Sequence, residues 1–147
     1  MALVHALAEY ERLSHECAMT ADQLHAALFA PEPALFGHVA EVDGEVVGFT
    51  LWFLSFSTFR GGHGIYLEDL FVRPDRRGTG LGRALLTELA EECVRRGYAR
   101  LEWAVLDWNE PAIGFYTSLG AAPRGGWSVF RLTDDALAAL GAGATAR

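Results

Sequence analysis

The pattern of apolar and polar positions at the start of the chain predicts two helices. Apolar residues at helical spacing predict a first helix over residues 2–13. Thr20 is a good N-cap for a second helix, with Gln23 at the capping-box position three residues later. The second helical pattern runs to about Phe29, and the proline-containing stretch that follows ends it.

The next segment has the composition of β-strands. Two β-rich runs, residues 35–42 and 45–56, flank the dipeptide Asp43-Gly44, which suits a tight type I′ hairpin turn. A further strand over residues 65–72 ends before Pro74. These runs predict an antiparallel meander.

A long amphipathic helix is predicted from Gly80 to Arg96, with Gly97 as its C-cap. Cys93 within it is expected to be a small buried thiol. The predicted apolar positions are Leu81, Leu85, Leu89 and Val94, and the predicted solvent-facing positions are Glu88, Glu91, Glu92 and Arg95.

The last third of the chain predicts a strand, a helix, a strand and a helix. A strand over residues 100–107 precedes a short helix that Asn109 opens as N-cap and Gly120 follows. Residues 127–132 predict a final strand, Thr133 caps a final helix, and residues 141–147 are expected to be a flexible tail.

This order of elements places the chain in the α/β (α+β) class. A meander that feeds a β-α-β-α-β unit predicts one mixed, mostly antiparallel sheet with helices on both faces. Neither an internal repeat nor a linker interrupts the pattern, so we expect a single domain over residues 1–140.

Composition narrows the possible functions. The chain has 147 residues and a net charge of −7, which argues against general nucleic-acid binding. The apolar runs are too short for a membrane span and the first residues lack a signal-peptide pattern, so we expect a cytoplasmic protein. Two distant cysteines and scattered histidines offer no metal-ligand spacing, so no metal is expected.

Against this acidic background, "RRGTGLG" at residues 76–82 gathers arginines and glycines ahead of the long helix. Glycines let the backbone approach a ligand, and a helix N-terminus offers N–H donors to an anion. The lysine of a P-loop is absent, and Arg83 replaces the third glycine of the dinucleotide fingerprint. A glycine-rich connection with solvated arginines is the structural alternative to an anion site.

The spacing Arg77-x-x-Gly80-x-Gly82 matches the (Q/R)xxGx(G/A) pyrophosphate signature of the Gcn5-related N-acetyltransferases (GNAT). "YLEDLFVRPDRRGTGLGRALL" and "EWAVLDWNEPAIGFYTSLGA" resemble the two cofactor segments of that family, and "LAEYERL", "VGFTLWF" and "GWSVFRL" match as well. The chain is most similar to the diamine (spermidine/spermine) and thialysine acetyltransferase branch, from near Leu3 to about Leu140. It departs from the family in lacking the first β-strand, which carries an "IRPA"-like motif.

The resemblance implies the GNAT fold, with a bulged and splayed central strand pair, and acetyl-CoA as co-substrate. The backbone of Leu70 and Val72 would pair with the pantetheine arm, and Asn109 would contact it, although an ordinary N-cap is an equally physical role for that asparagine. The implied cofactor-binding residues are Leu70, Phe71, Val72, Arg77, Gly78, Thr79, Gly80, Leu81, Gly82, Arg83, Asn109, Ala112 and Tyr116.

The resemblance also implies the catalytic residues. Tyr116 aligns with the general acid that protonates the departing thiolate, and a core aromatic is its structural alternative. Glu68 aligns with the carboxylate that takes the proton of the ammonium substrate, through a water. Strand alternation puts Glu68 and Asp69 on opposite faces, so we expect only one of them to reach a given cleft, and Asp69 to be a substrate anchor or a structural group.

The residues implied for the amine substrate are Tyr10, Glu11, Glu68, Asp69 and Trp103. An aspartate of the polyamine enzymes corresponds here to about Ser57, with Arg60 close by, which weakens attraction to a long polycation. The predicted function is N-acetylation of a small primary amine, with diamines or polyamines first and a basic amino acid or thialysine as the alternative. The alternative from another functional class is a non-catalytic acyl-CoA-binding protein. The resemblance also implies a homodimer.

Overall fold

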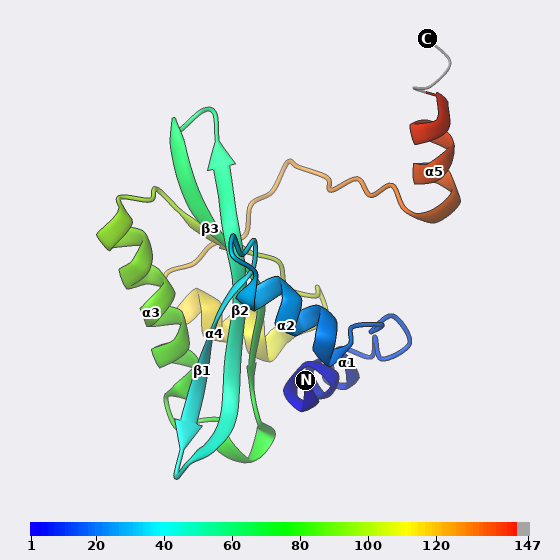
Figure 1. Ribbon diagram of the computed structural model, residues 1–147. Helices are drawn as coiled ribbons and strands as arrows, with labels where there is room; N and C mark the ends of the chain where they lie inside the picture. Colours follow the sequence, from blue (N-terminus) through cyan, green and yellow to red (C-terminus); the bar gives the residue numbers. More distant parts are fainter. Residues whose placement is uncertain (144–147) are drawn as a thin grey trace. The chain divides into compact units, whose positions relative to one another are not determined.

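The computed structural model describes residues 1–143, and the chain forms two compact units, Met1–Trp108 and the residues from Asn109 onward. The elements, in chain order (Figure 1), are α1 (Ala2–Tyr10), α2 (Ala21–Phe29), β1 (Phe36–Val42), β2 (Glu45–Ser57), β3 (Gly62–Val72), the 3-10 turn η1 (Pro74–Arg76), α3 (Leu81–Arg96), β4 (Leu101–Trp103), α4 (Glu110–Ser118) and α5 (Asp134–Gly143).

The strands form one mixed sheet in the order β1-β2-β3-β4, which confirms the predicted fold class. β1 and β2 pair antiparallel, β2 and β3 pair antiparallel, and β3 and β4 pair parallel. The predicted hairpin turn is present between β1 and β2: Asp43 has φ 53° and Gly44 has φ 79°, and a type I′ turn requires positive φ at both positions. The first connection of the sheet is therefore encoded locally.

Helices cover both faces of the sheet in the first unit (Figure 1). Leu7 of α1 forms a core cluster with Phe49, Leu51 and Phe71, and residues of α1 and α2 pack around that cluster. α3 lies on the opposite face and contacts all four strands. The predicted capping box of α2 is formed, with the backbone N–H of Gln23 donating to Thr20 Oγ1 and that of Thr20 donating to Gln23 Oε1.

The buried side of α3 differs from the predicted one. Leu85, Leu86, Leu89 and Cys93 are buried as a helical stripe, which confirms the buried thiol. Val94 was expected in that stripe but is 82% exposed, because five residues after Leu89 it lies about 140° around the helix. Glu92 was expected to face solvent, but it is buried and forms ion pairs with Arg95 and Arg96.

Several predicted ends of helices and strands are wrong, and β3 begins at Gly62 rather than at residue 65. α1 ends at Tyr10 rather than at residue 13, because Glu11 is its C-cap and Arg12 adopts φ 63°. β4 covers only Leu101–Trp103 of the predicted 100–107, since its pairing with β3 stops at Leu67. α5 extends to Gly143, so part of the expected flexible tail is helical, and residues 144–147 of that tail lie outside the described residues.

The predicted final strand over residues 127–132 is absent. These residues have no regular structure in the described chain, and Trp127, Val129 and Phe130 are exposed. β-propensity reflects packing against neighbouring strands more than an intrinsic backbone preference, so a β-rich run without a partner strand stays irregular. Separately, none of the helices in the described residues has the length and apolarity to cross a membrane.

The placement of α3 predicts a large difference between two substitutions on the same helix. Leu89 is fully buried, so Leu89→Ala should lower the free energy of unfolding by about 2–5 kcal/mol through lost burial and the cavity left behind. Val94→Ala, on the exposed side, should change it by less than about 0.5 kcal/mol. Urea unfolding followed by circular dichroism measures both; equal losses would contradict the observed helix orientation.

Candidate active site

A β-bulge interrupts the pairing of the two central antiparallel strands. Leu51 pairs with Asp69 and Trp52 pairs with Leu67, so Glu68 is an extra residue on β3 without an opposite partner on β2. A bulge bends its strand and re-aims the side chains at the insertion. The bulge expected for this strand is therefore present, and it falls at the residue aligned with the catalytic base.

β3 and β4 separate at the same point. Their parallel pairing runs from Ile65 opposite Leu101 to Leu67 opposite Trp103 and does not continue past the bulge. Residues 68–72 of β3 consequently have no β4 partner on that side. This is the splayed strand pair that the resemblance implies. Trp103 lies half-buried at the point of separation, and Leu70 and Val72 line the open edge.

Three carboxylates share the region of the bulge. Burial, then Glu68, then Glu11 raise the pKa of Asp69 to about 6. Burial and Glu68 raise the pKa of Glu11 as well. Glu68 therefore acts electrostatically on both Glu11 and Asp69, and Glu11 acts on Asp69. Glu68 is exposed and Asp69 is half-buried, and which of them reaches the substrate stays a prediction. Among the described residues, no three His, Cys, Asp or Glu side chains are grouped as a metal site.

An aromatic contact lies at Tyr10, the residue that precedes Glu11 in the chain. The rings of Tyr10 and Trp108 are 6.1 Å apart between centroids. The guanidinium carbon of Arg12 lies 4.9 Å from the centroid of the Trp108 ring, within the range of a cation–π contact. The end of α1, expected to meet the amine substrate, is thus held by an aromatic contact.

The glycine-rich turn has the backbone that an anion site needs. Gly78 and Gly80 adopt φ 74° and 90°, and Gly80 is the N-cap of α3, a helix of 16 residues. A Cβ added at either glycine would meet no atom within 4 Å, so the surface above them is open. Thr79 Oγ1 donates to the carbonyl of Arg76 at 2.6 Å, which ties the turn together. Backbone N–H groups at a helix N-terminus suit a diphosphate.

The side chain of Arg77 is directed toward the protein. Its Nε donates to the carbonyl oxygen of Val72 at 3.0 Å. Its guanidinium carbon lies 4.7 Å from the centroid of the Tyr10 ring and 5.5 Å from that of Phe71. Arg77 therefore links the glycine turn, β3 and α1. The Arg77 side chain was also expected to add a charge-assisted donor for the anion, beside the backbone contact, and that role stays a prediction. Arg83 is exposed on the first turn of α3.

The remaining predicted site residues lie in the second unit. Asn109 caps α4 by accepting a hydrogen bond from the backbone N–H of Ala112 at 3.3 Å, which confirms its N-cap role. Tyr116 and Phe115 are both half-buried, with ring centroids 5.2 Å apart. The catalytic role of Tyr116 stays a prediction.

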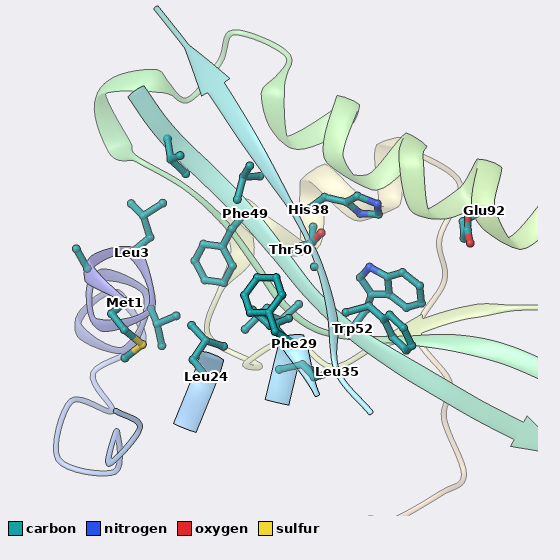
Figure 2. A pocket seen from close by; sticks show the side chains of 18 of the residues that line it. Met1, Leu3, Leu24, Phe29, Leu35, His38, Phe49, Thr50, Trp52 and Glu92 are labelled. Carbon is teal, nitrogen blue, oxygen red and sulfur yellow. The ribbon is translucent and has the colours of Figure 1, made fainter. Parts of the chain in front are cut away.

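A cavity of about 790 Å³ lies elsewhere in the first unit, at the free edge of β1 (Figure 2). Its walls come from α1, α2, β1 and β2, and Glu92 of α3 closes one end. None of the predicted site residues lines it. Three buried polar atoms at this cavity, His38 Nδ1, Thr50 Oγ1 and Trp52 Nε1, have no hydrogen-bond partner among the described residues.

Comparison with known proteins decides the family. The profile of the acetyltransferase (GNAT) family matches residues 2–121. The chain belongs to this family. It is 38% identical over 149 residues to the thialysine N-epsilon-acetyltransferase of Bos taurus, covering 94% of this chain and 87% of the relative. It is 44% identical over 98 residues to the L-ornithine N5-acetyltransferase NATA1 of Arabidopsis thaliana, covering 67% and 43%.

A solved structure agrees with the fold. The V. cholerae integron cassette protein VCH_CASS6 has a TM-score of 0.79 and 24% identity, covering 95% of this chain and 87% of that one. That likeness concerns the fold alone. The family match and the curated relatives identify an acyl-CoA-dependent N-acetyltransferase that acts on an amine.

Sequence reasoning missed several neighbours of this acetyltransferase's bulge. Glu68 and Glu102, after burial, raise the pKa of Tyr66, which places that phenol beside the carboxylates. The ring of Trp108 contacts Tyr10 at the end of α1, and Arg12 makes a cation–π contact with Trp108. The sequence signal that could have identified Trp108 is its position next to Asn109, an expected cofactor residue.

The raised pKa of Asp69 predicts how stability depends on pH. Its pKa of about 6 in the folded state exceeds the ordinary value of 3.8 for an aspartate, so the folded state binds more protons between those pH values. Stability should therefore fall as the pH rises from about 4 to about 6. Asp69→Asn removes the cost of ionising a buried carboxyl group and should raise the free energy of unfolding at pH 7.5 by about 1–3 kcal/mol.

Asp75→Asn is the matched control, because hydrogen bonding to Arg73 lowers the pKa of Asp75 and its charge is favourable in the fold. That variant should not be stabilised. Chemical denaturation between pH 4 and pH 8 measures both variants. If Asp69→Asn kept the wild-type dependence on pH, the assignment of the desolvated carboxylate would be wrong.

Proposed function

We propose that this acetyltransferase transfers the acetyl group of acetyl-CoA to the terminal primary amine of a small basic amino acid, such as thialysine or ornithine. The carrying observation is the group of carboxylates at the bulge: Glu68 and Asp69 lie on the strand that leads into the glycine turn, and Glu11, the C-cap of α1, acts electrostatically on Asp69. The glycine turn suits an anion, and the carboxylates at the bulge suit a cation. The names of two relatives, a thialysine and an ornithine acetyltransferase, support the choice of amine.

Acetyl-CoA would bind at the turn and along the open edge of β3. The backbone from Arg77 to Arg83 would hold the diphosphate at the N-terminus of α3. Leu70 and Val72 would pair with the pantetheine arm along the edge that β4 leaves open, and Asn109 and Ala112 at the start of α4 would complete the binding. The positive φ of Gly78 and Gly80 supports this role, since side chains there would strain the backbone.

The reaction requires a neutral amine, because an ammonium has no free electron pair. Glu68 would accept the ammonium proton through a water, with Asp69 and Glu11 anchoring the cationic substrate beside Tyr10 and Trp103. The amine nitrogen then attacks the thioester carbonyl, the carbon–sulfur bond breaks, and Tyr116 gives its proton to the departing thiolate. The N–H proton that the nitrogen loses on becoming an amide would restore the phenol. Backbone N–H groups at the bulge would stabilise the tetrahedral oxyanion. The products are the N-acetylated amine and free coenzyme A.

A diamine or polyamine is the second candidate substrate. Three neighbouring carboxylates favour a cation, and a diamine presents ammonium groups without a carboxylate. Polyamine enzymes carry an aspartate at about the position of Ser57, and Arg60 is close by in this chain. The missing carboxylate and the nearby arginine favour the amino acid as substrate instead. We also propose, from the family resemblance, that the enzyme is a cytoplasmic homodimer.

An amine panel tests the function. Purified enzyme with acetyl-CoA should release free thiol, and kcat/KM for thialysine and ornithine should exceed that for spermidine by about tenfold or more, a difference of about 1.4 kcal/mol in transition-state binding. Putrescine and lysine complete the panel. Tight acetyl-CoA binding without thiol release on any amine would instead indicate a non-catalytic acyl-CoA-binding protein.

Removal of the phenol of Tyr116 tests the general acid. Tyr116→Phe should lower kcat by about 10²-fold or more while leaving the KM for acetyl-CoA within a few-fold, because only proton transfer to the thiolate is lost. Tyr98→Phe makes the same chemical change away from the predicted site and should retain wild-type kcat. Thiol release across pH 6–10 measures both variants, and full activity of Tyr116→Phe over this range would exclude the assignment.

A further inference from the structure

Arg12 directly follows the C-cap of α1 and has an unusual backbone conformation. The N–H of Leu13 donates to the carbonyl of Ala8 at 2.8 Å. The N–H of Arg12 donates to the carbonyl of Glu9 at 3.0 Å, which completes a Schellman motif whose left-handed position normally carries glycine. Arg12 has φ 63°, and this conformation is unfavourable for a residue with a Cβ. An arginine kept there against its backbone preference indicates a task for its side chain.

An aromatic contact fixes where the Arg12 side chain lies. Its guanidinium carbon is 4.9 Å from the centroid of the Trp108 ring, and that ring is 6.1 Å from the ring of Tyr10. Tyr10 is one of the residues expected to meet the amine substrate. Arg12 therefore lies one aromatic ring beyond Tyr10. A planar guanidinium that stacks on a ring keeps the N–H donors at its edge available for an anion.

The protein does not neutralise the charge of Arg12. Among the described residues, Arg12 forms no ion pair with a carboxylate, and it is exposed. Glu11, the residue before it, responds instead to the bulge, since burial and Glu68 raise the pKa of Glu11. Two consecutive residues at the end of α1 thus provide a carboxylate that interacts with the bulge and a cation beside it.

Arginine supplies all the strongly basic side chains of this protein, which contains no lysine. Most arginines of the first unit have a partner. Those paired with carboxylates are Arg73, Arg76, Arg95, Arg96 and Arg100. Arg77 is held by the carbonyl of Val72 and by two rings, and Arg83 lies at the glycine turn. Among the described residues of this unit, that leaves Arg12 and Arg60 as cations for a substrate carboxylate.

Arg60 lies too far from the bulge to contact a small substrate there. It is in the turn between β2 and β3, and Glu68 is six residues along β3 from Gly62, the first residue of that strand. At 3.3 Å per residue, the bulge is about 20 Å from that turn. A few carbon atoms separate the terminal amine of a basic amino acid from its carboxylate. Arg12, next to Glu11, is therefore the better placed of the two arginines.

We propose that Arg12 binds the α-carboxylate of the basic amino acid whose terminal amine the enzyme acetylates. The inference rests on the proposed function and names the residue that recognises the amino-acid end of the substrate. The guanidinium donates charge-assisted hydrogen bonds to the carboxylate. A diamine has no carboxylate to offer, and Arg12 repels its second ammonium. Arg12 thus selects the amino acid both by attraction and by repulsion of the competitor.

Ornithine and putrescine form a matched pair of substrates, because putrescine is ornithine without its carboxylate. The ratio of their kcat/KM values therefore isolates recognition of that group. The wild type should prefer ornithine by about tenfold or more, and Arg12→Gly should reduce this ratio by about tenfold or more, through a higher KM for ornithine. The kcat/KM for putrescine should stay the same or rise. Thiol release measures each value.

Three variants separate recognition from a structural role. Glycine is the residue that the left-handed position favours, so Arg12→Gly should keep or exceed the wild-type melting temperature. Arg12→Lys keeps a cation at the position and should retain a preference for ornithine. Arg60→Gln removes the other candidate arginine and should leave the ratio at the wild-type value.

Equilibrium binding separates the role of Arg12 from the proposed reaction. Calorimetry in the presence of coenzyme A, which has no acetyl group to transfer, gives the affinity of each amine without turnover. Ornithine should bind the wild type more tightly than putrescine does, and Arg12→Gly should lose that difference. This result without thiol release on any amine would refute the acetyl transfer and keep the role of Arg12.

The other outcomes overturn the inference in distinguishable ways. If Arg12→Gly kept the wild-type ratio, or if Arg60→Gln lowered it instead, Arg12 would not recognise the carboxylate and the proposed function would stand. A wild type that acetylates putrescine in preference to ornithine refutes the amino-acid substrate and the role of Arg12 together. A lower melting temperature of Arg12→Gly, with equal losses for both amines, would assign Arg12 a structural role.

Discussion

The extra residue on β3 is the constraint on which the other features of the first unit depend. β3 keeps its antiparallel pairing with β2 over its whole length, but the register shifts at Glu68 and the pairing with β4 ends one residue earlier. A sheet that stayed flat and fully paired here would have no free backbone edge beside the glycine turn. The insertion also places two consecutive carboxylates in the electrostatic reach of Glu11.

The two ends of this edge carry opposite charge for a physical reason. The N-terminus of α3 and its arginines provide a positive region, which lowers the free energy of a bound anion. The bulge gathers carboxylates whose burial raises their pKa values and weakens the fold. Such an arrangement costs stability and is retained in proteins where a cationic ligand relieves it. An anionic and a cationic substrate could then meet along one strand.

Local signals predicted much of the fold, and long-range pairing defined the rest. The Asp43-Gly44 turn and the Thr20 capping box depend on neighbouring residues and were predictable from composition at those positions. Val94 was assigned to the wrong side of α3, because the five-residue step from Leu89 was treated as part of one helical face. Glu92 was assigned to solvent, although three residues after Leu89 it lies on the buried face. Residues 127–132 have strand composition without a strand partner in the described chain, which no single-sequence pattern reveals. For the candidate site, Glu68 and the glycine turn were found from the family motif, whereas Tyr66, Trp108 and the shared field of the carboxylates required the fold.

The orientation of Arg77 also explains a feature of the family signature. The first position of (Q/R)xxGx(G/A) accepts glutamine or arginine, although one is neutral and the other is a cation. A side chain that serves as counter-charge to a diphosphate would not tolerate that exchange. Here the Arg77 side chain donates from Nε to the carbonyl of Val72, and a carboxamide N–H could make the same kind of bond. The position therefore selects for a hydrogen-bond donor of sufficient reach that fastens the loop to the strand end, and formal charge is secondary.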